Sequence, residues 1–300
     1  MLTKYLAKAL IKPARRPIVK NPSDYGMEYQ DIDFKSIDGT GLKAWYIPGK
    51  SDRLIIMTHP MPFNRYGFHT KGQGLTRISN VEVELLKTAK QLNAAGYGVF
   101  TFDFRNHGES DRANDGVCGV GYYEWQDIAG VMNYVNSSPK LKNNGIGFLS
   151  HCMGANATLI AMGKEPVLFK DVRAVVAIQP ISMNVFVPHY LKDKMPVFRN
   201  KTSKINEKIK SIAGFGLEDM SPAEYIKDIE VPILYVQVQN DAWTDPSDVQ
   251  GFYDNTQALK EIFWIEGDLE RFDGYNYFGE NPTKMLEFLE KYMDKGATPA

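Results

Sequence analysis

The sequence predicts an α/β fold, with a mostly parallel central sheet, helices on both faces and a helical cap insertion. From residue 29 onward, short β-branched apolar runs alternate with longer runs of helical periodicity. Glycines or prolines punctuate many of these runs. Strands that alternate with helices form a parallel sheet, because each crossover helix packs back on the strands it connects. The 300 residues are 43% hydrophobic, which suffices for one large domain with an insertion.

The first part of the chain opens with two strands, at 29–38 and 41–49, joined by an Asp-Gly turn. The apolar run at 53–60 ends at a proline, as expected of a buried central strand. Residues 81–96 have helical periodicity and end at a glycine, and 98–104 reads as the next buried strand.

The second part of the chain continues the alternation on both sides of residues 183–228. This segment contains prolines and many lysines, with a pair of helices expected around 203–216 and 221–229. We expect it to form a cap over the carboxyl edge of the sheet, between core segments 27–182 and 229–295. Ligands of such sheets bind at that edge. The remaining elements are expected at 123–138 (helix), 145–150 (strand), 154–163 (helix), 172–180 (strand), 231–238 (strand), 248–259 (helix), 261–267 (strand) and 281–293 (helix).

Residues 1–26 form a basic extension of different composition. Leu2, Leu6 and Leu10 recur at helical spacing with lysines between them, which predicts a basic amphipathic helix. Two interpretations remain open. The helix packs on its own domain or on another subunit of a homo-oligomer, or it contacts a membrane surface or an acidic partner.

Composition excludes several classes of function. The 35 basic residues are balanced by 36 acidic ones, so no excess charge is available to neutralise nucleic-acid phosphates. No apolar run is long enough for a transmembrane helix. Two cysteines make a disulfide framework improbable and favour a cytoplasmic protein. No spacing of ligands predicts a metal site, and no glycine motif follows the first strand, so we expect neither a metal nor another cofactor.

The segment 145–157 predicts a strand, a sharp turn of small residues and an immediate helix. Ser150, Cys152 and Gly154 follow the spacing of a nucleophile elbow, G-x-S-x-G, with cysteine in the central place. Small neighbours are needed because strand and helix pass close together. A thiol at a helix N-terminus is favoured as thiolate. We therefore predict Cys152 as the nucleophile, whereas Cys118 lacks such a context.

The pentapeptide SHCMG at 150–154 resembles the GHSMG elbow of α/β-hydrolases, and dienelactone hydrolases likewise carry cysteine there. Residues 94–111 resemble a second segment of these enzymes, and 29–48 resemble the opening strands of their serine-aminopeptidase-like branch. The resemblance extends from Tyr29 to Tyr292 and is weakest through the cap. It implies the α/β-hydrolase fold and a structural part for His107.

The resemblance also implies where the oxyanion hole lies. Its two main-chain N–H donors fall at Met61, after the third strand, and at Met153, after the nucleophile. Pro60 stands in place of the family's glycine, but the donor is the following residue. His59 is expected to brace this loop and to border the substrate.

The catalytic triad cannot be completed in the family's order. Asp241 falls at the acid position, while its rival Asp245 fits a turn better. Glu270 stands where the histidine should be, and no histidine follows His189. An ordinary glutamate has a pKa of about 4.3 and an ordinary thiol about 8.5, so proton transfer is uphill by about 5–6 kcal/mol. Glu270 is either a protonated donor beside Asp241 or an ion-pair partner of Arg271 outside the chemistry.

Other side chains could contribute to the site. His69 and His189 are alternative bases, whereas His151 is common in ordinary elbows and is not the base there. Trp243 and Tyr275 belong to aromatic-rich segments and are expected to line a pocket for a small apolar or aromatic substrate. The alternative is that their rings only pack in the core.

Three functions follow from these residues. The first is an enzyme in which Cys152 attacks an ester, thioester or lactone carbonyl, with Asp241 and Glu270 controlling protons. The second is a lyase, cyclase or C–C bond-forming enzyme on the same scaffold. The third is a binding protein with a degenerate site.

Overall fold

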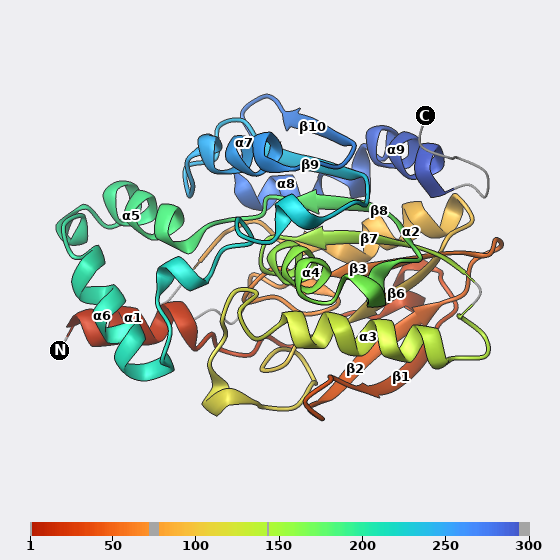
Figure 1. Ribbon diagram of the computed structural model, residues 1–300, viewed down its shortest axis with the longest axis horizontal. Coiled ribbons are helices and arrows are strands. Elements are labelled where there is room, and N and C mark those ends of the chain that lie inside the picture. Colours follow the sequence, from red (N-terminus) through yellow and green to blue (C-terminus); the bar gives the residue numbers. More distant parts are fainter. Residues whose placement is uncertain (1, 72–77, 143, 294–300) are drawn as a thin grey trace.

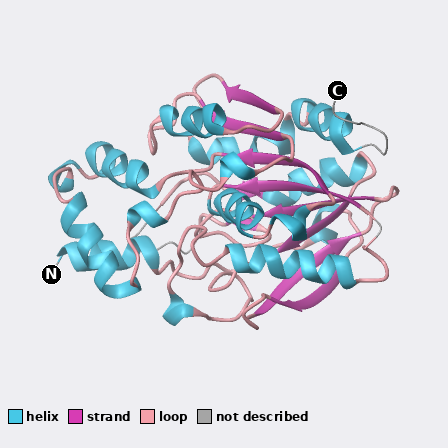
Figure 2. Cartoon of the chain, viewed as in Figure 1, coloured by secondary structure: helices cyan, strands magenta, loops and turns pink. Residues whose placement is uncertain are grey.

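The computed structural model describes residues 2–71, 78–142 and 144–293. In this part of the chain the main sheet has eight strands in the order β1-β2-β6-β3-β7-β8-β9-β10 (Figures 1 and 2). Loops join the ends of the strands to the helices. The predicted α/β architecture is confirmed. The strands are β1 Gln30–Lys35, β2 Gly41–Ile47, β3 Arg53–Thr58, β6 Gly98–Phe102, β7 Gly145–His151, β8 Val172–Ile178, β9 Ile233–Val238 and β10 Lys260–Ile265.

The direction of the strands gathers their carboxyl ends at one edge. β1 and β2 pair antiparallel, as does β2 with β6. All pairs from β6 through β3, β7, β8 and β9 to β10 are parallel. The loops after these parallel strands therefore meet, and this is where such sheets bind ligands.

Helices cover both faces of the sheet. A Cβ added to Gly147 in β7 would lie 2.9 Å from the sulfur of Met293, in α9 (Thr283–Met293). The ring of the next residue, Phe148, contacts Phe169 in η3 (Pro166–Phe169), which follows α4. Because successive strand residues point to opposite faces, α9 and α4 (Met153–Lys164) lie on opposite sides. Figure 1 shows α3 (Trp125–Ser137) beside α4 in front of the sheet.

Most predicted helices are confirmed, but the boundaries shift. α2 is Leu85–Ala94, because Val83 and Glu84 form strand β5, which pairs with β4 (Gly67–Phe68). α7 is Pro246–Asn255, starting slightly earlier than predicted.

The predicted cap segment, residues 183–228, differs from the expectation in two places. α6 (Thr202–Ala213) lies where a helix was predicted, but α5 (Met183–Lys194) was not predicted and contains Pro188 in its interior. The predicted helix at 221–229 is wrong. Its hydrogen bonds run from N–H to the carbonyl three residues back, giving only the short turn η6 (Ile226–Asp228).

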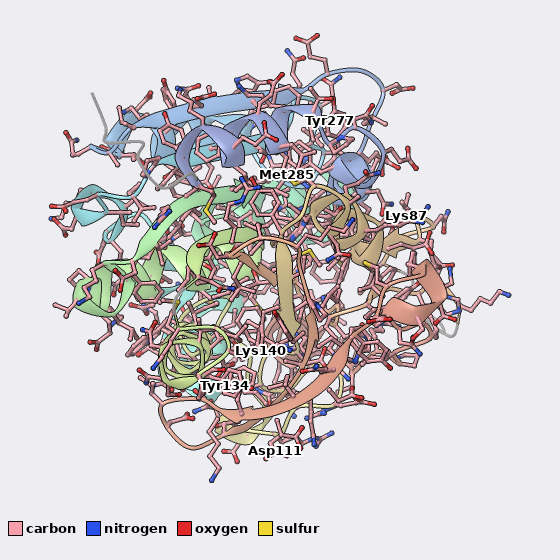
Figure 3. The ribbon with its side chains drawn as sticks, turned by 90° about the vertical axis from the view of Figure 1, so that its right-hand side faces the viewer. Lys87, Asp111, Tyr134, Lys140, Tyr277 and Met285 are labelled. Atoms are coloured by element: carbon pink, nitrogen blue, oxygen red, sulfur yellow. The ribbon has the colours of Figure 1, made fainter. Side chains whose placement is uncertain are left out.

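Helix α8 (Arg271–Glu280) was also not predicted from the sequence. It packs on α2, where Gly279 faces Lys87. Figure 3 shows Met285 of α9 among the side chains of the interior and Lys87 toward the rim.

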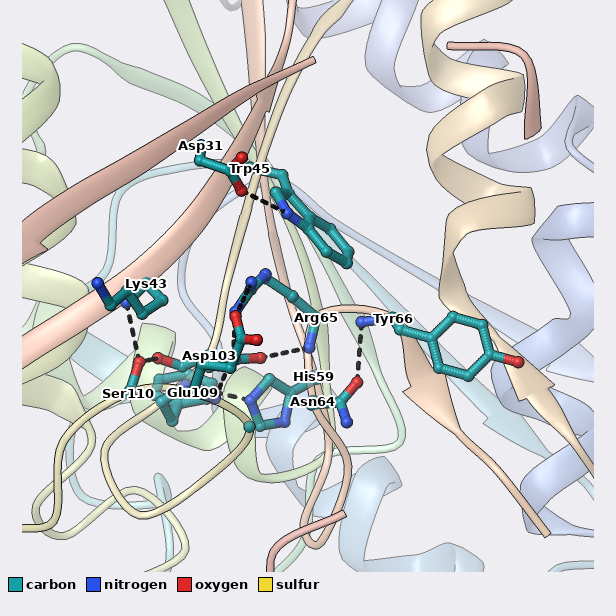
Figure 4. A network of polar contacts seen from close by, with 12 residues as sticks. Asp31, Lys43, Trp45, His59, Asn64, Arg65, Tyr66, Asp103, Glu109 and Ser110 are labelled. Atoms are coloured by element: carbon teal, nitrogen blue, oxygen red, sulfur yellow. Dashed lines mark hydrogen bonds and ion pairs between the residues drawn. The ribbon is translucent and has the colours of Figure 1, made fainter. Parts of the chain in front are cut away.

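A buried polar network fixes the loops after β3 and β6 (Figure 4). The carboxylate of Asp103 accepts hydrogen bonds from the main-chain N–H groups of Arg65 at 2.7 Å and Glu109 at 2.9 Å, and it pairs with the Arg65 guanidinium. Nε2 of His59 accepts the N–H of Phe104 at 3.1 Å. These bonds hold the loop that contains Met61 at the carboxyl edge of the sheet.

Helix α1 (Leu2–Ile11) packs on α6, and both lie at the same end of the molecule (Figure 1). Ala7 and Ile11 are fully buried, and the carbonyl of Ile11 accepts the N–H of Cys118 at 2.7 Å. The helix thus packs on its own domain, which is one of the arrangements considered for this segment. None of the described helices has both the length and the apolar character needed to cross a membrane.

Candidate active site

Cys152 occupies the turn between β7 and α4 in a strained backbone conformation, with φ 47° and ψ −110°. Such a conformation is rare outside glycine and persists only where surrounding contacts enforce it. The N–H of Cys152 donates to the carbonyl of Ile178 in β8 at 2.8 Å, and its own carbonyl accepts from Asn156 at 2.9 Å. Cys152 remains 7% exposed. This is the backbone geometry of a nucleophile elbow.

The small residues around Cys152 are explained by the close approach of α4 to β3. A Cβ on Gly154 would lie 2.8 Å from the Cβ of Thr58, closer than real side chains come. Ser150 is small enough to place its hydroxyl 2.9 Å from that of Thr158 in α4. The sequence pattern at 150–154 therefore reflects packing between strand and helix.

A buried ion pair lies at the position where the family's acid and histidine were expected. Nη1 of Arg271 lies 2.5 Å from Oδ2 of Asp241, and both side chains are almost fully buried. Asp241 also accepts the side-chain amide of Gln237 at 3.0 Å and the main-chain N–H of Trp243 at 2.9 Å. A guanidinium, and not an imidazole, thus faces the predicted acid.

Gln179, the residue after β8, holds Arg271 from the other side. Its main-chain carbonyl accepts Nη2 of Arg271 at 2.8 Å, and its side-chain amide donates to the carbonyl of Arg271 at 2.9 Å. Gln179 has φ 51°, in the left-handed region that non-glycine residues rarely adopt. The end of β8 therefore holds Cys152, through Ile178, and Arg271, through Gln179.

Arg271 is permanently charged in this setting. Burial alone would lower its pKa, but negative charge on the groups that it faces (Tyr275 when ionised, Asp241 and Cys152) raises the pKa of Arg271 well above its usual value. The guanidinium can therefore compensate negative charge on Asp241 and on the sulfur at the same time.

Tyr275 lies one helical turn after Arg271. The Cζ atom of the guanidinium lies over the Tyr275 ring, 5.7 Å from the ring centroid. Burial raises the pKa of Tyr275 well above its usual value; hydrogen bonding and negative charge at Cys152 act in the same direction, against Arg271. The phenol therefore keeps its proton at neutral pH and can donate it as a hydrogen bond toward Cys152.

Glu270 does not lie where the sequence placed it. It is exposed and precedes α8, and its main-chain N–H donates to Asp273 at 2.9 Å. Both expected roles, a donor beside Asp241 and an ion pair with Arg271, are wrong because Arg271 itself pairs with Asp241. Arg271 and Gln179 are the residues that sequence reasoning missed. Recognition of 271–280 as a helix would have placed Arg271 and Tyr275 on one face, four residues apart.

The histidines take other places. His151 is buried, its Nδ1–H donates to the carbonyl of Thr58 at 2.7 Å, and burial lowers its pKa to about 4. His69 pairs with Glu82 at 2.6 Å. Burial lowers the pKa of His107 to about 4, and its Nδ1–H donates to the carbonyl of Arg105, a structural part as expected. His189 lies half-buried in α5.

The remaining predicted site residues lie in loops or at the first turn of a helix. His59 braces its loop as expected, with Nδ1–H 2.9 Å from the carbonyl of Pro60, but its ring is fully buried and offers no surface to a substrate. Met153 is the first residue of α4, so its N–H has no acceptor within the helix. Met61 is half-buried in the loop after β3. Asp245 begins α7 by accepting the N–H of Ser247, as the turn interpretation predicted.

A row of aromatic rings connects the elbow with α5. The ring centroid of Tyr275 lies 5.9 Å from that of Phe272, and the centroid of Phe272 lies 5.4 Å from that of Trp243. Trp243 in turn lies 5.1 Å from Tyr190 of α5, and Tyr190 stacks on Phe186 at 5.8 Å. Trp243, Tyr190 and Phe186 are only partly buried.

Part of the chain is similar to a known protein family. Residues 128–250 match the family model "BAAT / Acyl-CoA thioester hydrolase C terminal". The matched stretch contains both the elbow and Asp241, and it supports an enzyme of the hydrolase type. No curated protein sequence matches the chain.

Solved structures show the fold. An esterase of Pyrococcus furiosus is similar with a TM-score of 0.71 and 21% identity over 95% of this chain and 98% of that one. The acylaminoacyl peptidase of Pyrococcus horikoshii is similar with a TM-score of 0.64 and 18% identity over 90% of this chain and 42% of that one. An esterase of Exiguobacterium antarcticum has a TM-score of 0.56 and 15% identity, covering 87% and 98%. The chain has the α/β-hydrolase fold.

Proposed function

We propose that this α/β-hydrolase-fold chain is a thioester hydrolase in which Cys152 is the nucleophile. The observation that carries the proposal is a cysteine in the strained backbone conformation of a nucleophile elbow, 7% exposed, beside the buried pair of Arg271 and Asp241. The match to an acyl-CoA thioester hydrolase domain supports the same reaction class. The matched proteins do not favour a lyase, a cyclase or a binding protein.

The first step is acylation of the thiolate. The sulfur of Cys152 attacks the carbonyl carbon, a C–S bond forms and the carbonyl electron pair moves to oxygen. The N–H groups of Met61 and Met153 hold this oxyanion. Collapse of the adduct breaks the substrate's C–S bond and releases a thiolate. Arg271 compensates the charge on sulfur before attack, and Asp241 and Gln179 keep the guanidinium in place.

The second step is hydrolysis of the acyl-enzyme. Water attacks the acyl carbon, and the C–S bond to Cys152 breaks to give a carboxylate and the free thiolate. Of the two protons from water, one goes to the substrate's thiolate that left in the first step, and the other goes to the solvent. The aromatic row from Tyr275 to Trp243 is proposed as the wall for an apolar acyl group.

The substrate class follows from the leaving group. A thiolate leaves readily because ordinary thiols have a pKa of about 8.5, whereas an alkoxide is nearer to the 15.7 of water and needs a proton from a general acid. The five histidines all lie within the described residues, and none of the hydrogen bonds that their rings make there goes to Cys152. Such a site suits thioesters better than oxygen esters.

Two further features belong to this proposal. Residues 183–228 act as a cap, since α5 contributes Tyr190 and Phe186 to the aromatic row. The protein works in the cytoplasm, which is supported by two cysteines that are both free.

The test compares matched thioesters and oxygen esters of the same acyl chain. We expect kcat/KM to be at least about 100-fold higher for thioesters, equivalent to about 2.7 kcal/mol of transition-state stabilisation. Intact-mass measurement after brief incubation should show one acyl group on Cys152. Cys152→Ala should lose both the adduct and turnover, while the matched control Cys118→Ala retains them.

An adduct on any other residue, or turnover by Cys152→Ala above the uncatalysed rate, would contradict the proposal. Glu270→Gln serves as a second control: it should leave kcat/KM within about twofold, because Glu270 is exposed and outside the site.

A further inference from the structure

We propose that a basic lobe, formed by residues 2–12 together with residues 192–210, docks on anionic lipid surfaces. The two segments lie far apart in the sequence, but α1 packs on α6 and brings them to the same end of the molecule (Figure 1). This inference does not depend on the proposed reaction.

The charge of the lobe is opposite to that of the rest of the chain. Its two segments contain ten basic residues and two acidic ones, which gives +8, whereas the whole chain has a net charge of −1. The remaining residues therefore carry −9. A molecule with this asymmetry orients its basic end toward a negative surface over distances near the Debye length, about 8–10 Å.

The charges are displayed on the outer faces of both helices. In α6, Ile205 and Ile209 are buried, while Lys201, Lys204 and Lys208 are exposed and follow one another at helical spacing. In α1, Ala7 and Ile11 are buried against the protein, and Lys4 and Lys8 are exposed one turn apart. Two ion pairs within or beside the lobe, Lys194 with Asp193 and Lys210 with Glu218, leave the lysines on these faces uninvolved.

Large apolar side chains stand among these lysines. Val197, in the turn between α5 and α6, is 84% exposed, and Leu2 and Tyr5 of α1 are 56% and 58% exposed. Of the described large hydrophobic side chains, these three are among the most exposed. Apolar tips surrounded by lysines are typical of surfaces that insert shallowly between anionic lipid headgroups.

Other occupants fit less well. A second copy related by a two-fold axis would bring the same positive face against itself and is repelled. An acidic macromolecule in water satisfies the lysines but gives Val197 no apolar environment. A lipid surface satisfies both features, so we commit to lipid headgroups and their underlying acyl chains.

Vesicle sedimentation tests the inference, with vesicles of phosphatidylcholine alone and of phosphatidylcholine mixed with phosphatidylserine. We expect partitioning at least about tenfold stronger onto the serine-containing vesicles, and loss of binding at high salt. The triple variant Lys201→Gln, Lys204→Gln, Lys208→Gln should bind about 100-fold more weakly. The matched control Lys35→Gln, Lys90→Gln, Lys170→Gln removes the same charge from exposed sites outside the lobe and should stay within about twofold.

Val197→Ser separates a lipid surface from a soluble polyanion. This variant should bind serine-containing vesicles several-fold more weakly and heparin as well as the unchanged protein. Equal binding to both vesicle types, equal loss in both triple variants, or heparin binding without vesicle binding would each overturn the proposal; the last result would point to an acidic macromolecule. Thermal unfolding of every variant checks that the fold is unchanged.

Discussion

Arg271 and Asp241 are 2% and 5% exposed, so each side chain depends on the other to compensate its charge. Removal of one member of a buried pair leaves an unpaired charge in a poorly solvated place, and this is more destabilising than loss of the pair. The remaining bonds of Asp241, from Gln237 and Trp243, are neutral and cannot replace the guanidinium.

We therefore expect Arg271→Met to lower the free energy of unfolding by about 3–5 kcal/mol. The double variant with Asp241→Asn should recover part of this loss, because Asn keeps hydrogen-bonding capacity without the charge. Urea unfolding of the two single variants and the double variant measures the coupling. Additive losses would show that the two side chains do not act as a pair. Thioester turnover should fall in all three variants.

The approach of helix α4 to strand β3 is the element-scale feature that shapes the elbow. Gly154 faces Thr58, with the carbonyl of His59 only 3.1 Å from where a Cβ would be. A backbone atom cannot move aside as a side chain can, so a methyl group there must displace α4 or the end of β3.

Gly154→Ala should lower the free energy of unfolding by about 1–3 kcal/mol, as overpacking of a tight contact does. It should also change the rate at which iodoacetamide alkylates Cys152, because α4 begins directly after that residue. Gly251→Ala in α7 is the matched control, since no atom lies within 4 Å of its added Cβ. Helix propensity predicts that this control is neutral or slightly stabilising. Equal effects of the two substitutions would show that the close approach is not the cause.

The elements differ in how well the sequence predicts them. Strands such as β3 and β8 are predictable because continuous apolar runs leave few alternatives. Helix α8 was not predicted, for two reasons. Its aromatic residues at 272, 275 and 278 were interpreted as the wall of a pocket, and Glu270 stood at the position where the family's histidine was expected. Glu270 and Arg271 are neighbours in the sequence, but only a helix that begins after Glu270 turns Arg271 inward.

At the scale of the whole molecule, Asp248 is one group that makes stability depend on pH. Its carboxylate accepts the N–H of Ser182 at 2.6 Å, which connects α7 with the start of α5. Burial raises the pKa of Asp248 to about 6, although the hydrogen bond from Ser182 and the charge of Arg271 oppose the shift. The folded protein thus binds a proton at this carboxyl more tightly than the unfolded chain does, whose aspartates have a pKa of about 3.9.

The sign of the effect follows from proton linkage. As pH rises from about 4 to 6, the unfolded chain loses this proton first, so the free energy of unfolding decreases, by up to about 3 kcal/mol from this group. The loss is complete about one pH unit above the folded pKa, near pH 7. Asp248→Asn should remove this component and be more stable than the unchanged protein at pH 7 but not at pH 4. Urea unfolding at the two pH values checks the prediction. The same change in the free energy of unfolding between pH 4 and pH 7 in both proteins would contradict it.

The global fold was predictable from alternation alone, whereas the placement of charge was not. The composition of the chain is balanced, and the local runs of lysine at 2–12 and 192–210 are separated by about 180 residues. Only the packing of α1 on α6 shows that they form one surface. The Cys152 elbow, in contrast, was predictable because a contiguous strand-turn-helix pattern carries it.

Helix α1 also reaches the reactive centre through two short contacts. The carbonyl of Ile11, at the end of this helix, binds the main chain of Cys118, and the sulfur of Cys118 lies 3.3 Å from that of Met153, the neighbour of Cys152. One main-chain hydrogen bond and one sulfur–sulfur contact thus connect the chain's first helix with the turn that holds the reactive thiol.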